Sequence, residues 1–291
     1  MKIQNLITPL LFLFSSFAQS QDDLLNELVV GAPKFKDIEL ATFKGLQICN
    51  MQSTKIAAKG EWYFLVSHRF GDLTEGFNNF FGLDYAYSKI GGIYGLTDYL
   101  SIGATRHTYR KTYEFAAKYK LANQIVNGFP FNIVGYNTVE YNSELKNDAV
   151  QQGLTFKNRF AFTTQLLVSR KFNDSFSLEI APVYVHKNVY YGLLEQKATF
   201  LLASGARYKL TKRLSLNLEY AARLNLSDDT VSPYQNPLSL GLDLETGGHV
   251  FQFVFSNSQP MNDAAFYTNA SGRWDGKKQL YFGFNLYREF R

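Results

Sequence analysis

Apolar and polar residues alternate along much of this chain, most clearly between Arg213 and Leu226. Leucine, tyrosine and alanine hold every second position there, and mostly polar or charged residues lie between them. A period of two places the two sets on opposite faces of a β-strand. A strand that crosses a bilayer needs about 9 to 11 residues, with one face toward lipid and the other toward water. The segment therefore predicts a membrane-crossing strand.

The same alternation recurs through the chain from Gly60 onward. In one segment Tyr113, Phe115 and Tyr119 alternate with Glu114 and Lys118, so the charges fall on one side. Residues 84–96 are rich in glycine, and their register is ambiguous. Twelve strands are predicted, an even number as in bacterial single-chain barrels. They span 60–70, 84–96, 99–107, 111–121, 129–141, 158–172, 175–187, 197–210, 213–226, 237–245, 249–257 and 278–290.

The connections between these segments alternate between short and long. Links such as 97–98, 173–174 and 211–212 are tight and rich in turn formers, whereas 142–157 and 258–277 are long. Outer-membrane barrels have tight periplasmic turns and longer outer loops. The link at Tyr109-Arg110 is an exception, since it is too tight for a typical outer loop. Together these features predict an all-β fold, an antiparallel transmembrane β-barrel of about twelve strands over residues 60–291.

The first twenty residues have the form of a cleaved secretion signal. Lys2 precedes an apolar run from Leu6 to Phe17, which small residues Ala18 and Ser20 follow. Cleavage after either Ala18 or Ser20 fits this pattern. An uncleaved anchor helix would need about 20 apolar residues, and the run is too short. We therefore expect export through a cleaved signal and a location in the outer membrane.

Residues 21–59 differ from the alternating segments and are predicted to form an N-terminal periplasmic or luminal arm. The stretch from Asp22 to Val30 is typical of a short amphipathic helix with an acidic start. A further extended segment, Ala41 to Ile48, has three placements open to it: plugging the lumen, lining the periplasmic mouth, or pairing weakly as a strand.

The last strand is expected to carry the signal for the outer-membrane insertion machinery. Phe282, Phe284, Leu286 and Phe290 hold one register and give it an aromatic end. Phe290 is followed by Arg291, so the aromatic residue is penultimate and not terminal.

Composition narrows the class further. Aromatic residues make up 16% of the chain while mean hydropathy is only −0.19, and no apolar run after the signal approaches 18 residues, which excludes helical spans. A large soluble β-sandwich would share this composition, but the alternation of loop lengths argues against it. The single cysteine, Cys49, provides no disulfide framework. Lys and Arg number 30 against 25 acidic residues, too small an excess for nucleic-acid binding.

The polar register of the barrel supplies the candidate functional residues. A lumen of twelve strands lies between barrels filled by side chains and barrels with an aqueous channel. Inward charges could select small polar or charged solutes, or could pair with one another across the lumen. The inward candidates are Glu61, Arg69, Glu114, Lys118, Lys120, Arg159, Lys171, Glu179, Arg207, Lys209, Glu219, Arg223, Asp243 and Glu245.

Metal binding and catalysis are not expected. His68, His107 and His186 fall near the outer strand ends, but His107 alone is in the inward register. Ser67 and His68 cannot pair as nucleophile and base, because adjacent strand residues point to opposite faces. We expect no cofactor, and a hydrolase embedded in the barrel is the least favoured class.

Five segments of the chain carry a further signal: residues 42–45, 67–71, 80–84, 207–217 and 241–252. The run of residues 245–252, Glu-Thr-Gly-Gly-His-Val-Phe-Gln, is specific. In these segments the chain resembles a family of Bacteroidota outer-membrane β-barrel proteins of unknown function, and the likeness covers nearly the whole chain after the signal. The resemblance implies fold and location, and no substrate or catalytic residue.

The sequence therefore favours a porin-like passive channel for small polar or ionic solutes, in contact with outer-membrane lipid. The alternative is a non-conducting barrel that anchors or binds a partner of an envelope complex. Such a barrel would act through the arm, Asp22 to Asp37, or through the loop from Ser258 to Lys277.

Overall fold

The computed structural model describes residues 40–145, 155–192, 194–225, 232–246, 249–275 and 279–290. The chain divides into two units, 1–37 and 38–291, and every described residue belongs to the second. The expectations for the signal, for residues 21–39 of the arm and for Arg291 lie outside the described residues.

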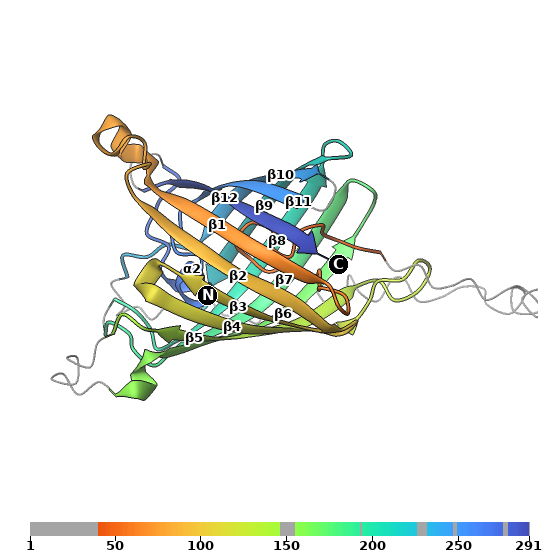
Figure 1. The fold of residues 1–291 in the computed structure, drawn as a ribbon, viewed down its shortest axis with the longest axis horizontal. Coiled ribbons are helices and arrows are strands. Elements are labelled where there is room, and N and C mark those ends of the chain that lie inside the picture. The colour runs from red at the N-terminus through yellow and green to blue at the C-terminus, as the bar shows by residue number, and fades with distance from the viewer. Residues whose placement is uncertain are drawn as a thin grey trace, which may run out of the picture. The chain divides into compact units, whose positions relative to one another are not determined.

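Twelve strands form one closed antiparallel barrel (Figure 1), as the alternation predicted. Each strand pairs with its neighbours in sequence, and β1 pairs with β12 to close the ring. The strands are β1 (Trp62–Asp72), β2 (Ala86–Thr97), β3 (Leu100–His107), β4 (Thr112–Ala122), β5 (Asn132–Asn142), β6 (Phe160–Lys171), β7 (Phe176–Lys187), β8 (Ala198–Lys209), β9 (Leu214–Arg223), β10 (Leu238–Thr246), β11 (His249–Ser256) and β12 (Tyr281–Phe290).

Two predicted strand boundaries were wrong in an informative way. The strand expected over 213–226 ends at Arg223, because side chains begin to take the place of backbone acceptors there: Asn225 accepts from the backbone of Phe200 and Asn236 from that of Arg223. The strand expected from residue 158 begins at Phe160, because Arg159 ends a short helix.

The described helices are short and lie in connections at one end of the barrel. They are η1 (Leu73–Asn79), η2 (Tyr109–Lys111), η4 (Phe156–Arg159) and α2 (Asp263–Thr268). We call the end of the barrel that carries these connections the loop end, and the end with the tight links the turn end. The described helices include none of the length and apolar character that a membrane crossing requires.

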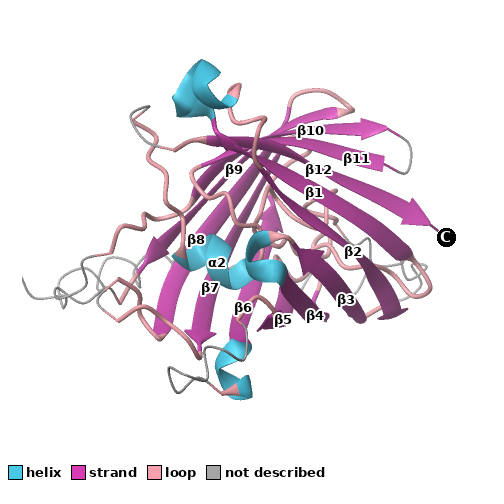
Figure 2. Ribbon diagram, turned by 60° about the vertical axis from the view of Figure 1, so that its left-hand side comes forward, coloured by secondary structure: helices cyan, strands magenta, loops and turns pink. Residues whose placement is uncertain are grey.

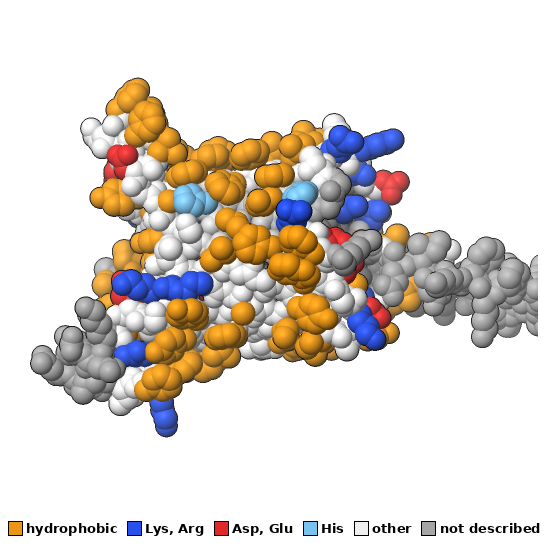
Figure 3. Space-filling model, in the orientation of Figure 1, with side chains coloured by type: hydrophobic (Ala, Val, Ile, Leu, Met, Phe, Trp, Pro, Cys, Tyr) orange, Lys and Arg blue, Asp and Glu red, His pale blue; other side chains and the backbone are white. Residues whose placement is uncertain are grey.

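The outer wall is apolar and the inner wall is polar. On β9, Leu216 and Leu218 are each 46% exposed, whereas the alternating Asn217 and Glu219 are each 1% exposed. Figure 3 shows hydrophobic side chains over much of the outer wall, with charged ones gathered near its two ends. This is the reverse of a soluble sheet, whose leucines would be buried. The two-sheet sandwich is therefore excluded.

The seam between β1 and β12 is lined outside by aromatic rings. Trp62 stacks on Phe290 with ring centroids 4.5 Å apart, and Phe70 stacks on Phe282 at 5.8 Å. His68 stacks on Phe284 at 5.7 Å. The aromatic residues of the last strand thus contact the first strand across the point of closure.

Two segments fill the lumen. Residues 40–57, which we call the luminal segment, are mostly buried and fill the turn-end half, and α2 lies within the ring of strands toward the loop end (Figure 2). Leu46 packs in a cluster with Leu65 and Tyr287, and Met51 belongs to a second cluster with Phe266. Among the placements left open for Ala41 to Ile48, the structure shows the luminal one.

The loop from Ser258 to Lys277 was expected on the outside, and for most of its described length this is wrong. From Ser258 to Ala270 nearly every residue is buried, because α2 and its flanks pack against β6 and β7 inside the barrel. The exposed part of the described loop is confined to residues 273–275.

An arginine placed on the outer wall tests whether that wall faces lipid. Replacing Leu218, at mid-strand, by arginine should lower the free energy of unfolding by about 2–4 kcal/mol in lipid vesicles, because the charge enters hydrocarbon. The matched change Leu210→Arg, in a turn at the barrel end, should cost about 0–1 kcal/mol. Denaturant titration of both variants measures this, and equal costs would contradict the orientation.

Candidate luminal site

A single buried carboxylate binds the middle of the luminal segment. Glu219 accepts hydrogen bonds from three successive backbone N–H groups, those of Cys49 (3.0 Å), Asn50 (3.0 Å) and Met51 (2.9 Å). It also accepts one from the Asn50 side-chain amide at 3.0 Å. Hydrogen bonds to a charged group are each worth about 1.5–3 kcal/mol. Glu219 therefore fixes the tip of the segment to β9.

Donors on β4, β11 and β12 bind the carbonyl groups of the same segment. Gln252 donates to the Ile48 carbonyl at 2.8 Å, and Asn285 to the Cys49 carbonyl at 2.7 Å. Lys118 Nζ donates to the carbonyls of Leu46 (3.0 Å), Ser53 (3.1 Å) and Lys55 (3.3 Å). A buried ammonium thus finds three acceptors in the chain itself.

Further contacts surround the segment from the remaining strands. Arg69, which is 0% exposed, donates to Asn50 Oδ1 at 2.9 Å. Glu179 accepts from the backbone N–H of Thr54 at 3.0 Å, and Asn132 donates to Thr42 Oγ1 at 2.6 Å. The partners lie on β1, β4, β5, β7, β9, β11 and β12. The segment is held from all sides of the barrel.

Glycines in the wall provide space for the side chains of the segment. A Cβ atom at Gly205 would lie 2.3 Å from Ile48 Cδ1, and one at Gly241 would lie 2.4 Å from Cys49 Sγ. Both distances are shorter than side-chain contacts normally are, so a side chain at either position would require Ile48 or Cys49 to shift. The wall and the segment therefore fit one another in shape as well as in hydrogen bonding.

The candidate residues fall into two groups by depth. Arg69, Glu114, Lys118, Glu179, Glu219 and Asp243 are nearly inaccessible inside the barrel. The others lie toward the ends: Glu61, Lys120, Lys171, Arg207, Lys209 and Glu245 at the turn end, and Arg159 and Arg223 at the loop end.

Arg207 and Glu245 show the expected pairing of opposite charges. Arg207 donates to Glu245 at 2.7 Å, near the turn end. Most of the buried candidates bind the luminal segment or the loop that carries α2, and not one another. The sequence suggested solute selection or charge pairing across the lumen, and it did not suggest this arrangement.

The inserted loop is held at the first turn of α2 by two carboxylates. Glu114 accepts from the backbone N–H of Asp263 at 3.1 Å, and Glu140 from that of Ala264 at 2.7 Å. Negative groups at a helix N-terminus satisfy N–H groups that have no partner within the helix. Lys89 on β2 pairs with Glu114 on β4 at 3.2 Å.

Sequence reasoning missed Lys89 and Glu140. Glu140 stands two residues beyond Thr138 in the inward register of β5, so its parity could have identified it. Lys89 lies in the glycine-rich stretch whose register was ambiguous.

The histidines lie where their parity placed them. His107 is 1% exposed with Nε2 3.6 Å from Glu114, whereas His68 faces outward and bonds to Ser88 at 2.8 Å. Within the described ranges, no group of three or more His, Cys, Asp or Glu side chains could hold a metal ion.

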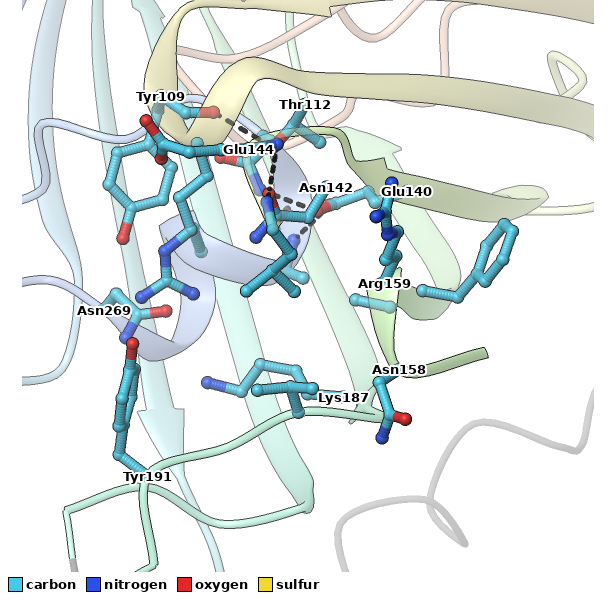
Figure 4. Close-up of a pocket in the computed structure, with 18 residues that line it drawn as sticks. Tyr109, Thr112, Glu140, Asn142, Glu144, Asn158, Arg159, Lys187, Tyr191 and Asn269 are labelled. Atoms are coloured by element: carbon cyan, nitrogen blue, oxygen red, sulfur yellow. Dashed lines mark hydrogen bonds between the residues drawn. The ribbon is translucent and has the colours of Figure 1, made fainter. Parts of the chain in front are cut away.

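A cavity of about 150 Å³ opens at the loop end, outside the region that the luminal segment fills. Arg110 of η2, Arg159 of η4 and Lys187 of β7 contribute cations to its lining. Polar groups come from β5 and from the residues that flank α2 (Figure 4). Arg159 is the one member of the candidate set that lines this cavity.

A closed barrel with an apolar outer wall and a polar lumen defines a membrane-bound, porin-like protein. Its sequence matches the family model described as "Membrane bound beta barrel domain (DUF5777)" over residues 43–290. The chain belongs to this family of membrane-bound barrels.

Solved porins share the fold. The KdgM porin in complex with disordered oligogalacturonate is similar at 10% identity with a TM-score of 0.51, over 79% of this chain and 99% of that one. The NanC porin is similar at 8% identity with a TM-score of 0.50, over 78% and 99%. No curated protein matches the chain in sequence.

Cys49 reports whether the luminal segment stays bound. It is 0% exposed, and burial, followed by the nearby carboxylates of Glu219 and Asp243, raises the pKa of its thiol. In folded protein a maleimide reagent should therefore label it slowly. Because Glu219→Gln removes the charge from these hydrogen bonds, labelling should accelerate about ten- to a hundredfold. The exposed control Glu75→Gln should label at the wild-type rate, and a Glu219→Gln rate equal to wild type would contradict the anchoring role.

Docking of the inserted loop should depend on pH through Asp263. Burial, followed by the Glu114 carboxylate, raises its pKa from 3.8 to about 7, against the opposing effect of Lys89 and Lys118. A raised pKa in the folded state stabilises docking fully below about pH 4, and this stabilisation is lost as pH rises through about 7.

Trp274, on the same loop, reports this change. In a Trp62→Phe background, acrylamide should quench its fluorescence more at pH 8 than at pH 5.5, and Asp263→Asn should reduce the difference. The control Asp84→Asn, on another outer loop, should keep it. If the difference in quenching between pH 8 and pH 5.5 is the same in Asp263→Asn as in its parent, the pH dependence belongs to other groups.

Proposed function

We propose that this protein is an outer-membrane channel for small polar or ionic solutes, closed at rest by its own luminal segment. The observation that carries the proposal is the binding of Cys49, Asn50 and Met51 to Glu219 inside a porin-like barrel. A polar inner wall provides a route for solutes, and the bound segment occupies that route.

The remaining space supports a closed resting state. Beside the luminal segment, the cavity against β1 to β4 measures about 30 Å³, and that near Arg223 and Lys187 about 10 Å³. These are of the size of a single water molecule. Passage of a larger solute therefore requires the segment, and the loop that carries α2, to move aside.

The solute class rests on the polarity of the inner wall. The wall residues that hold the segment are amides, carboxylates and amines, which become a polar lining when the segment leaves. One structural neighbour was solved in complex with oligogalacturonate, a polar and acidic solute, which supports this class.

We further propose that residues 1–20 are a cleaved signal, that residues 21–59 form an arm, and that residues 60–291 form the barrel of a Bacteroidota outer-membrane protein. Phe282, Phe284, Leu286 and Phe290 would be recognised by the insertion machinery. We propose no enzymatic activity for the barrel.

The filled lumen also favours a second function, a non-conducting barrel. In that case the luminal segment would be a permanent core that anchors the preceding arm for a partner of an envelope complex. The two functions differ in whether the segment ever leaves.

A reversible lock distinguishes them. Because a Cβ at position 241 would lie 2.4 Å from Cys49 Sγ, Gly241→Cys places a second thiol within reach of the native one. In planar bilayers, Glu219→Gln should increase channel openings over wild type. Glu219→Gln with oxidised Gly241→Cys should show none, and reduction should restore them.

The control carries Cys49→Ser in the same background, where oxidation should have no effect. Currents that persist in the oxidised variant would place the route elsewhere. Absence of current in every state, including reduced Glu219→Gln, would contradict the channel and support the non-conducting barrel.

A further inference from the structure

The cavity at the loop end is built from η2, η4, α2 and the loop-end residues of β4 to β7, and it lies apart from the luminal segment. Its floor is the first turn of α2, where Asn262 and Ala264 are fixed by Glu140 at 2.6 Å and 2.7 Å. Its sides come from η2, the end of β5, η4 and the end of β7 (Figure 4). Because the floor is pinned by two hydrogen bonds, the cavity is preformed.

Two carboxylates, Glu140 and Glu144, line the cavity beside its three cations. Lys187 pairs with Glu195 at 3.2 Å, and Glu140 accepts hydrogen bonds from Asn262 and Ala264. Arg110 has no ion pair within 4.0 Å among the residues that the structure describes, and its guanidinium lies 5.2 Å from the Tyr109 ring centroid. An arginine in this setting is suited to bind a carboxylate through two parallel hydrogen bonds.

The backbone at Arg110 is held in an unfavourable conformation. Its φ is 48° and its ψ is 23°, and the following Lys111 has a φ of 47°. Left-handed backbone at residues other than glycine, asparagine and aspartate is strained, and such strain clusters at binding and catalytic sites. The turn at Tyr109-Arg110, too tight for an ordinary outer loop, thus places Arg110 at the cavity.

The rest of the lining is polar. Asn142, Asn158 and Asn269 contribute amides, and Tyr191 contributes a phenol. Figure 4 shows Tyr191 and Asn269 on one side of the cavity and Asn158 on the other. A cavity of about 150 Å³ holds a molecule the size of benzene, which has six heavy atoms. Unlike an apolar cavity of this volume, this cavity is lined by hydrogen-bonding groups.

We propose that this cavity is a binding site for a small organic carboxylate that carries hydroxyl or amide groups, with Arg110 as the residue that recognises the carboxylate. The ligand has about six to ten heavy atoms, to fit the volume and its open mouth. Binding at this site does not require passage through the barrel, so it stands apart from the channel proposal.

Glycerate and its uncharged isostere glyceramide provide the test. Ligand-detected NMR on the full-length protein in lipid nanodiscs should show millimolar binding of glycerate and at least about tenfold weaker binding of glyceramide. Equal binding of the two would overturn recognition of the charge. Tighter binding of inorganic phosphate than of glycerate would overturn the carboxylate assignment.

Two neighbouring substitutions locate the site. Arg110→Asn removes the guanidinium and accepts left-handed backbone readily, so the barrel should keep its stability while glycerate binding falls at least about tenfold. Lys111→Asn removes the same charge from the same strained turn, but Lys111 does not line the cavity, so binding should be retained. Equal binding by Arg110→Asn and wild type, or equal losses in both variants, would overturn the assignment to Arg110.

Discussion

The structure depends on one constraint: every polar group removed from bulk water needs a partner. In hydrocarbon the backbone meets this constraint by closing the sheet, so β1 pairs with β12 and no edge remains. Closure creates an interior lined by every second residue. Since that interior is too narrow to hold bulk water around each charge, the inward Arg, Lys and Glu side chains need partners of their own.

The chain supplies those partners itself. Glu219 finds three backbone N–H groups, and Lys118 finds three carbonyls, all in the luminal segment. Glu114 and Glu140 find the first turn of α2. The lumen thereby acquires a packed core in which Met51 and Phe266 share one apolar cluster. The contacts that stabilise the barrel are the same ones that close its lumen. The stability of the folded protein is therefore linked to the passage of solutes.

The alternation of residues was sufficient to predict the strands, because one face must be apolar wherever lipid lies. It predicted that Glu219 and Arg69 point into the lumen, but it could not identify their partners. An alternating pattern specifies the face of the strand on which a residue lies, and not what that face contacts. The segment from Ala41 to Ile48 has no period that would reveal its place. Lys89 was missed because the adjacent glycines carry no side-chain signal, and Arg110 because a turn has no register at all.

Residues 49–51 lie inside the folded barrel, where their backbone N–H groups bind Glu219. Hydrogen–deuterium exchange on the membrane-inserted protein, resolved to single amides by NMR, measures this placement residue by residue. We expect the amides of Cys49, Asn50 and Met51 to exchange as slowly as those of the central residues of β9. Exchange of these amides at the rate of an unstructured peptide, with β9 still protected, would contradict it.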